Sequence, residues 1–159
     1  MKRKILISAC LLGEKVKYDG GDNALHVSLI EQWKQEGLLV SVCPEVLGGL
    51  SIPRIPSEVE QGSHRVLNKA GEDVTHAFEK GAHHALEIAQ KEGVVMAILK
   101  ARSPSCGKGV IYDGTFTGTK VSDSGITCKV LEEQGIAVFS EEELEEASAF
   151  YTNSRSHGH

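Results

Sequence analysis

The sequence has no long apolar segment and no excess of positive charge. No apolar run approaches the roughly 20 residues of a membrane-spanning helix. The opening segment, "MKRKILISACLLGEK", becomes charged too early for a secretory signal. With 17 Lys and Arg against 22 Asp and Glu, the formal net charge is -5, so no basic surplus is available to bind a polynucleotide backbone. We therefore expect a cytoplasmic protein with neither a membrane nor a polynucleotide as partner.

The common cofactor and metal motifs are also missing. No G-x-G-x-x-G opens a helix after the first expected strand, and no G-K-[ST] occurs, so a dinucleotide or P-loop site is not indicated. The seven histidines lack metal-ligand spacing, and we expect them to be structural or exposed. The four cysteines include no C-x-x-C pair. In a cytoplasmic protein such cysteines are free thiols or metal ligands rather than disulfides.

The composition is that of one globular domain. The chain has 159 residues, of which 40% are hydrophobic and 25% charged, as in ordinary folded proteins. This length is enough to bury one core and too short for two. We expect a single domain over residues 1–150. The last residues, "TNSRSHGH", have no apolar anchor, so we expect a disordered tail over 151–159.

Short apolar runs alternate with longer segments of helical periodicity. This alternation predicts a three-layer, Rossmann-like α/β fold, with an open, mostly parallel sheet and helices on both faces. The segment 44–68 holds three of the four prolines, and we expect a long irregular loop there with one short strand at 65–67. Residues 109–121 read as a hairpin or loop. The expected strands are 4–9, 38–42, 94–100 and 137–140, and the expected helices are 23–36, 73–92, 123–134 and 141–150.

Three cysteines occupy equivalent places in this pattern. Cys10, Cys43 and Cys106 each lie at or just beyond the carboxyl end of an expected strand. In a parallel sheet that edge is where ligands bind. Any one of them could be a small core residue. Three together indicate a bound metal centre, because neighbouring thiolates repel one another unless they share protons or a cation. Cys128, within an expected helix, is better explained by helix packing.

The cysteine spacing bears on the type of centre. A structural zinc site would require four ligands and usually a close cysteine pair. Three cysteines without such a pair favour an iron–sulfur cluster with one iron left open to solvent or substrate. Polar residues near these cysteines are candidates for chemistry or substrate binding, although each could be an ordinary loop residue. They are Asp19, Glu45, Arg54, Ser103 and Ser105.

Three motifs together resemble a known family. "ISACLLGEKVKYDGG", "CPEVLGGLSIPRIPSE" and "LKARSPSCGKG" occur in the order found in a bacterial family once catalogued as a domain of unknown function, whose characterised members are thiouracil desulfidases. The resemblance covers about residues 5–140. It implies a [4Fe–4S] cluster held by Cys10, Cys43 and Cys106. Cys128 stands where the family's "GVTA"-like segment has a small residue, which supports its assignment as a non-ligand.

The resemblance also implies a reaction. The open iron would bind the thiocarbonyl sulfur of a thiolated pyrimidine base such as 2-thiouracil and polarise its carbon for attack by water. The products would be uracil and hydrosulfide, with no net electron transfer. Glu45 would act as base or proton shuttle, and Ser103 would position the substrate or relay the proton. Asp19, Arg54 and Ser105 would contact the substrate. We expect the protein to be a monomer or a weak dimer.

Two other functions use the same cysteines. The protein could store or transfer sulfide or an iron–sulfur cluster without catalysis. It could also be a thiol or zinc enzyme with Cys106 as nucleophile. Glu45 and the two serines beside the expected ligands favour the desulfidase, because a carrier has no need of them. The natural substrate stays open among a free base, a nucleoside and thiolated RNA fragments.

Overall fold

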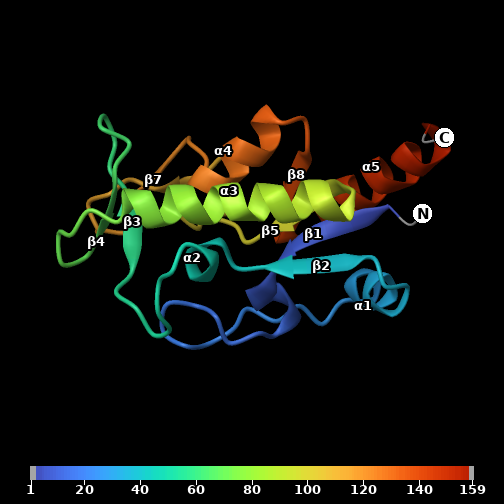
Figure 1. The fold of residues 1–159 in the computed structure, drawn as a ribbon, viewed down its shortest axis with the longest axis horizontal. Coiled ribbons are helices and arrows are strands. Elements are labelled where there is room, and N and C mark those ends of the chain that lie inside the picture. Colours follow the sequence, from blue (N-terminus) through green and yellow to red (C-terminus); the bar gives the residue numbers. More distant parts are fainter. Residues whose placement is uncertain (1–2, 158–159) are drawn as a thin grey trace.

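A four-stranded parallel sheet forms the centre of the protein. The computed structural model describes residues 3–157. The strands are β1 (Lys4–Ser8), β2 (Leu39–Val42), β5 (Val94–Leu99) and β8 (Ala137–Ser140), in the order β2-β1-β5-β8. Every neighbouring pair in this sheet is parallel. The predicted α/β class and the four main strands are therefore confirmed (Figure 1).

Helices cover both faces of the sheet, which makes three layers. Side chains of a strand alternate between its faces. Ile5 and Ile7 face a core shared with α1 (Ser28–Gln35) and α5 (Leu144–His157). Leu6, between them, faces a second core shared with α3 (Thr75–Glu92) and α4 (Ile126–Glu133). Because both faces are buried, the strands are almost wholly apolar, as is usual for parallel sheets.

The strand order reverses between β1 and β5. The chain passes from β1 outward to β2, and then returns to place β5 on the other side of β1. The loops leaving these two strands therefore diverge and open a crevice at their carboxyl ends, where ligands bind in open α/β sheets. This edge is the one on which the three cysteines were expected.

The first helix begins later than its apolar periodicity predicts. We expected it over 23–36, whereas α1 spans Ser28–Gln35. The backbone N–H groups of Asn23 and Leu25 donate to the carbonyls of Cys10 and Leu11, at 2.9 and 2.8 Å. These donors are thereby satisfied outside a helix. Residues 20–25 run beside a short 3₁₀ helix, η1 (Ala9–Leu12), that carries Cys10.

The segment expected to be one irregular loop contains three short elements. These are α2 (Pro44–Leu47), β3 (Ser57–Val59) and β4 (Val66–Asn68), with β3 and β4 antiparallel. The short strand predicted at 65–67 corresponds to β4. The hairpin predicted within 109–121 is present as β6 (Ile111–Tyr112) and β7 (Lys120–Val121).

The last helix is longer than predicted. After η2 (Glu141–Glu143), α5 continues to His157, through residues that we expected to be disordered. Tyr151 is only 6% exposed. Its ring packs 5.7 Å from that of Trp33, and its hydroxyl donates to the Arg3 carbonyl at 2.7 Å. Residues 158 and 159 lie outside the described part of the chain.

Within residues 3–157, no helix is both long and apolar enough to span a membrane.

Candidate active site

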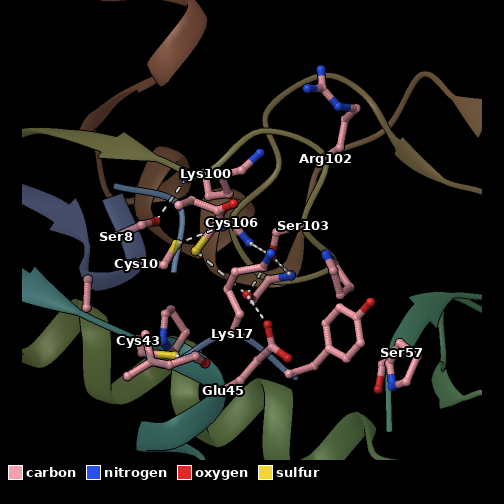
Figure 2. Close-up of a pocket in the computed structure, with 18 of the residues that line it drawn as sticks. Ser8, Cys10, Lys17, Cys43, Glu45, Ser57, Lys100, Arg102, Ser103 and Cys106 are labelled. Carbon is pink, nitrogen blue, oxygen red and sulfur yellow. Dashed lines mark hydrogen bonds between the residues drawn. The ribbon is translucent and has the colours of Figure 1, made fainter. Parts of the chain in front are cut away.

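A pocket of about 420 Å³ opens at the carboxyl ends of the parallel strands. Cys10, Cys43 and Cys106 all line it. Figure 2 shows that these side chains come from three separate segments and face the same cavity. The fold thus brings together three thiols that are far apart in sequence.

Local structure orients the first two cysteines. Cys10 lies in η1, directly after β1. Cys43 ends the extended segment of β2 and is the N-cap residue of α2, with φ -125° and ψ 100°. Pro44 is the first residue of α2, where its fixed φ suits a helix and its missing N–H costs nothing. The turn from strand to helix at Cys43 is therefore sharp and rigid.

The third cysteine lies in a tightly bonded loop. The Ser103 hydroxyl accepts hydrogen bonds from the backbone N–H groups of Ser105 and Cys106, both at 3.1 Å. Gly107 N–H donates to the Ser103 carbonyl at 2.8 Å. The Ser105 carbonyl accepts from Thr127 N–H, at 2.8 Å, in the first turn of α4. Helix α4 thus holds the loop that carries Cys106 through this hydrogen bond.

Burial keeps the three thiols neutral in the absence of a metal. Desolvation is the largest cause raising the pKa of Cys10 and of Cys43, and it raises the pKa of Cys106 to about 12. The charge of Cys43 also raises the pKa of Cys10, and that of Cys10 raises the pKa of Cys106. The cysteines are therefore close enough to affect one another's ionisation. A cation that binds all three would remove this repulsion.

The described residues hold no ready site for a single ion. Within residues 3–157, no group of three or more His, Cys, Asp or Glu side chains is arranged to bind one metal ion. All four cysteines are free thiols. A polynuclear cluster differs from a single ion because each thiolate binds a different iron, so its ligands need not converge on one point.

A hydrogen-bond chain joins a carboxylate to the cysteine loop. Ser105, 1% exposed, donates through its hydroxyl to Glu45 Oε2 at 3.2 Å, and its Oγ lies 3.0 Å from that of Ser103. Because Ser103 Oγ already accepts two backbone N–H groups, its own proton is free to donate to Ser105. The other Glu45 oxygen, Oε1, accepts from Arg54 Nε at 3.1 Å. The chain runs from Ser103 through Ser105 to Glu45.

A sequence model of the family described as 2-thiouracil desulfurase matches residues 5–143. The chain belongs to the 2-thiouracil desulfurase family. The family that the three motifs resemble is thereby confirmed.

Two relatives of the family align with nearly the whole chain. The solved structure of the [4Fe-4S]-dependent thiouracil desulfidase TudS is 42% identical and superposes with a TM-score of 0.91, covering 95% of this chain and 99% of that one. Uncharacterized protein YbbK of Bacillus subtilis (strain 168) is 40% identical over 148 residues, which are 88% of this chain and 97% of that protein. The fold of this chain is thus that of TudS, and both relatives match it over nearly their whole length.

Most of the residues predicted for the site line the pocket, and one does not. Those in the lining are Cys10, Cys43, Glu45, Arg54, Ser103, Ser105 and Cys106. Asp19 is absent from it. Its carboxylate accepts from Gly21 N–H at 2.9 Å and closes an exposed turn. The geometry therefore gives Asp19 a role in loop structure, and the roles of the others in binding or catalysis stay predictions.

Several pocket residues were not found from the sequence. Asn23 donates from Nδ2 to Cys10 Sγ at 3.4 Å. Ser8, at the end of β1, accepts from Lys100 N–H at 2.9 Å, and Lys100 forms an ion pair of 2.9 Å with Glu141. Ser8 could have been noticed from the sequence, because it is a polar residue that directly follows the apolar run of the first expected strand. Asn23 and Glu141 gave no signal, since their contacts depend on how distant loops fold.

Proposed function

We propose that this protein is a [4Fe–4S]-dependent desulfidase that removes sulfur from a thiolated pyrimidine base such as 2-thiouracil. One observation carries the proposal: three free cysteines converge on a pocket at the switch point of the sheet, with the Glu45 carboxylate beside them. The kinship with TudS, itself a [4Fe-4S]-dependent thiouracil desulfidase, supports the same cofactor here.

The donor set fits the proposed cluster. Cys10, Cys43 and Cys106 supply three thiol sulfurs, the usual ligands of iron–sulfur clusters, and the described residues offer no fourth cysteine in the pocket. Cys128 is fully buried among the side chains of α4 and its neighbours. When bound by three thiolates, such a cluster supplies one open iron, a Lewis acid for a thiocarbonyl sulfur.

Glu45 lies where its carboxylate can accept a proton from the attacking water. Thiouracil and water give uracil, hydrosulfide and one proton, so the water oxygen must lose both of its protons as it becomes the new carbonyl oxygen. A carboxylate that lines the pocket can accept such a proton. The hydroxyls of Ser105 and Ser103 form a hydrogen-bond chain with this carboxylate, along which a proton can be relayed.

Arg54 contributes by orienting Glu45. Its side chain is only 8% exposed, and its donors go to Glu45, the Ser51 carbonyl and the Val16 carbonyl, at 3.1, 3.2 and 3.0 Å. The two carbonyl bonds fix the guanidinium, and its bond to Oε1 holds the Glu45 carboxylate in one orientation. Since Arg54 and Ser105 both line the pocket, we propose that they also define the edge against which the base lies.

The two alternative functions find less support in the geometry. A carrier of sulfide or clusters would not require a buried chain from Ser103 to Glu45. A thiol enzyme would require a reactive thiolate, whereas burial raises the pKa of Cys106 to about 12 and leaves it a neutral thiol at neutral pH.

The remaining proposals concern the setting of the protein. We propose that a monomer or a weak dimer is active. Four free cysteines are in keeping with a reducing cytoplasm. Sedimentation at several concentrations tests the oligomeric state, and a stable dimer throughout would refute it.

The function is tested by anaerobic reconstitution with iron and sulfide. We expect about four irons and four sulfides per chain, a brown chromophore, and conversion of 2-thiouracil to uracil with release of hydrosulfide in equal amount. Metal-free protein, prepared in parallel, should have no activity. Full turnover by the metal-free protein would refute the cluster mechanism, and a stable cluster without turnover would favour the carrier.

A further inference from the structure

Asn23 holds Cys10 at two points. Its backbone N–H donates to the Cys10 carbonyl at 2.9 Å, and its side-chain Nδ2 donates to Cys10 Sγ at 3.4 Å. The residue also lines the pocket. The sulfur of Cys10 is therefore an acceptor whose direction is set by a neutral amide donor.

The other two cysteines have different surroundings. Cys43 Sγ donates to the Val16 carbonyl at 3.9 Å, and backbone N–H groups of Glu45 and Val46, rather than a side chain, face the same sulfur. Cys106 Sγ faces the hydroxyls of Ser8 and Ser105, the latter at 3.7 Å, but each hydroxyl has only one proton and that of Ser105 also faces Glu45 at 3.2 Å. The amide nitrogen of Asn23 carries two N–H protons and directs one of them at the sulfur of Cys10.

We propose that Asn23 is a positioning residue that orients the Cys10 thiolate and raises the reduction potential and oxygen stability of the cluster it helps to hold. This inference rests on the proposed function. Reduction adds negative charge to a cluster and its thiolates, and an N–H donor at a ligand sulfur stabilises the more negative state. The same bond holds the sulfur in place when the cluster is attacked by oxygen.

The loop does not depend on the Asn23 side chain for its shape. Leu25 N–H donates to the Leu11 carbonyl at 2.8 Å, and Asp22 accepts from Ala24 N–H at 2.9 Å. The backbone bond from Asn23 to Cys10 survives any substitution except proline. Variants at this position should therefore fold, and their effects should report on the bond to sulfur.

The test compares Asn23→Ala, Asn23→Asp and Asn23→Gln after anaerobic reconstitution. Alanine removes the donor, aspartate keeps the shape but presents an acceptor to the sulfur, and glutamine keeps an amide. Asp22→Asn is the matched control, because it alters the neighbouring residue of the same exposed loop, keeps an oxygen acceptor for Ala24 N–H and does not touch Cys10. The readouts are the midpoint potential of the cluster and the rate of its bleaching in air.

We expect the midpoint potential to fall in Asn23→Ala and further in Asn23→Asp. In other metal sites, loss of a hydrogen bond to a ligand lowers the metal affinity by about 10- to 100-fold. We therefore expect the clusters of these two variants to bleach in air about tenfold faster than that of wild type. Asn23→Gln should lie closer to wild type than Asn23→Ala does, and Asp22→Asn should match wild type. If Asn23→Ala is insoluble, Asn23→Asp carries the test, since it preserves the side-chain shape.

Potentials and bleaching rates equal to those of wild type in both Asn23→Ala and Asn23→Asp would overturn the inference. That outcome, with an intact wild-type cluster, would leave the proposed function standing. A wild-type protein that assembles no four-iron cluster would instead refute the proposed function.

Discussion

At the residue scale, the four cysteines divide into three that share a pocket and one that does not. Cys10, Cys43 and Cys106 line the cavity at the strand ends. Cys128 is fully buried on α4, where burial first and the nearby Glu132 charge second raise its pKa to about 12. The chemistry of a thiol is the same in each case, so position alone separates the three proposed ligands from the packing residue.

We predict that serine at position 10, 43 or 106 abolishes cluster binding, because a three-ligand site has no ligand to spare. Cys128→Ser is the control and should keep a full complement of iron. Iron and sulfide counts and the visible spectrum after reconstitution measure the result. Loss of the chromophore in Cys128→Ser, with retention in one of the other three variants, would show that the ligands are misassigned.

Glu45→Gln should keep the cluster and lose turnover of 2-thiouracil. Glutamine preserves the shape and can still accept from Arg54, but it cannot take a proton, so kcat should fall by about 10²- to 10⁴-fold. Glu60→Gln, on an exposed turn beyond β3, is the control and should be as active as wild type. If Glu45→Gln turned over at near the wild-type rate with an unchanged spectrum, the carboxylate would be structural.

At the scale of elements, the crossing of α2 and α3 fixes the segment that carries Cys43 and Glu45. A Cβ atom on Gly81 of α3 would overlap the carbonyl oxygen of Pro44. In the same way, a Cβ atom on Gly48 would overlap the carbonyl oxygen of Ala77. The two backbones therefore meet directly, without side chains between them. The position of Glu45 depends on this contact.

Gly81→Ala tests this dependence. Alanine improves helix propensity by about 1 kcal/mol in a helix interior. The overlap with Pro44 should outweigh this gain, because overpacking costs about 1–3 kcal/mol. We expect a lower melting temperature and reduced iron content, as α2 moves and carries Cys43 with it.

Gly135→Ala is the control for a loss of stability without movement of the site. Its Cβ atom would meet nothing within 4 Å, but its φ of +81° makes alanine strained by about 1–2 kcal/mol. It should therefore lower the melting temperature and leave the iron content unchanged. Full iron content in Gly81→Ala would show that the helix crossing does not govern the cysteine site.

At the scale of the whole molecule, the open crevice that admits a substrate also admits oxygen. A cubane held by three thiolates exposes one iron, and that iron is the most easily lost on oxidation. Protein purified in air should therefore be nearly inactive, and anaerobic reconstitution with iron and sulfide should restore activity. Activity assays with iron counts before and after reconstitution measure this, and undiminished activity of the air-purified protein would contradict it.

The local features of this protein were already encoded in its sequence. Short continuous apolar runs predicted the four parallel strands, and helical periodicity predicted the α3 helix, because both patterns arise within one segment from the geometry of its own backbone. The cysteines at strand ends followed from the same patterns. Since parallel strands end at a common edge, Cys10, Cys43 and Cys106 could be assigned to one site before their separation in space was known.

Contacts between distant segments were decided only by the tertiary structure. The bond from Ser105 to Glu45 joins residues 60 positions apart, and Asn23 reaches Cys10 across a loop. The Asp19 carboxylate, although chemically suited to bind a substrate, instead accepts a hydrogen bond within its own turn. Tyr151 packs on Trp33 and lies in a helix that continues beyond its predicted end. No local pattern specifies such pairs, because they depend on strand order and on the path of loops whose conformations follow from the packed core.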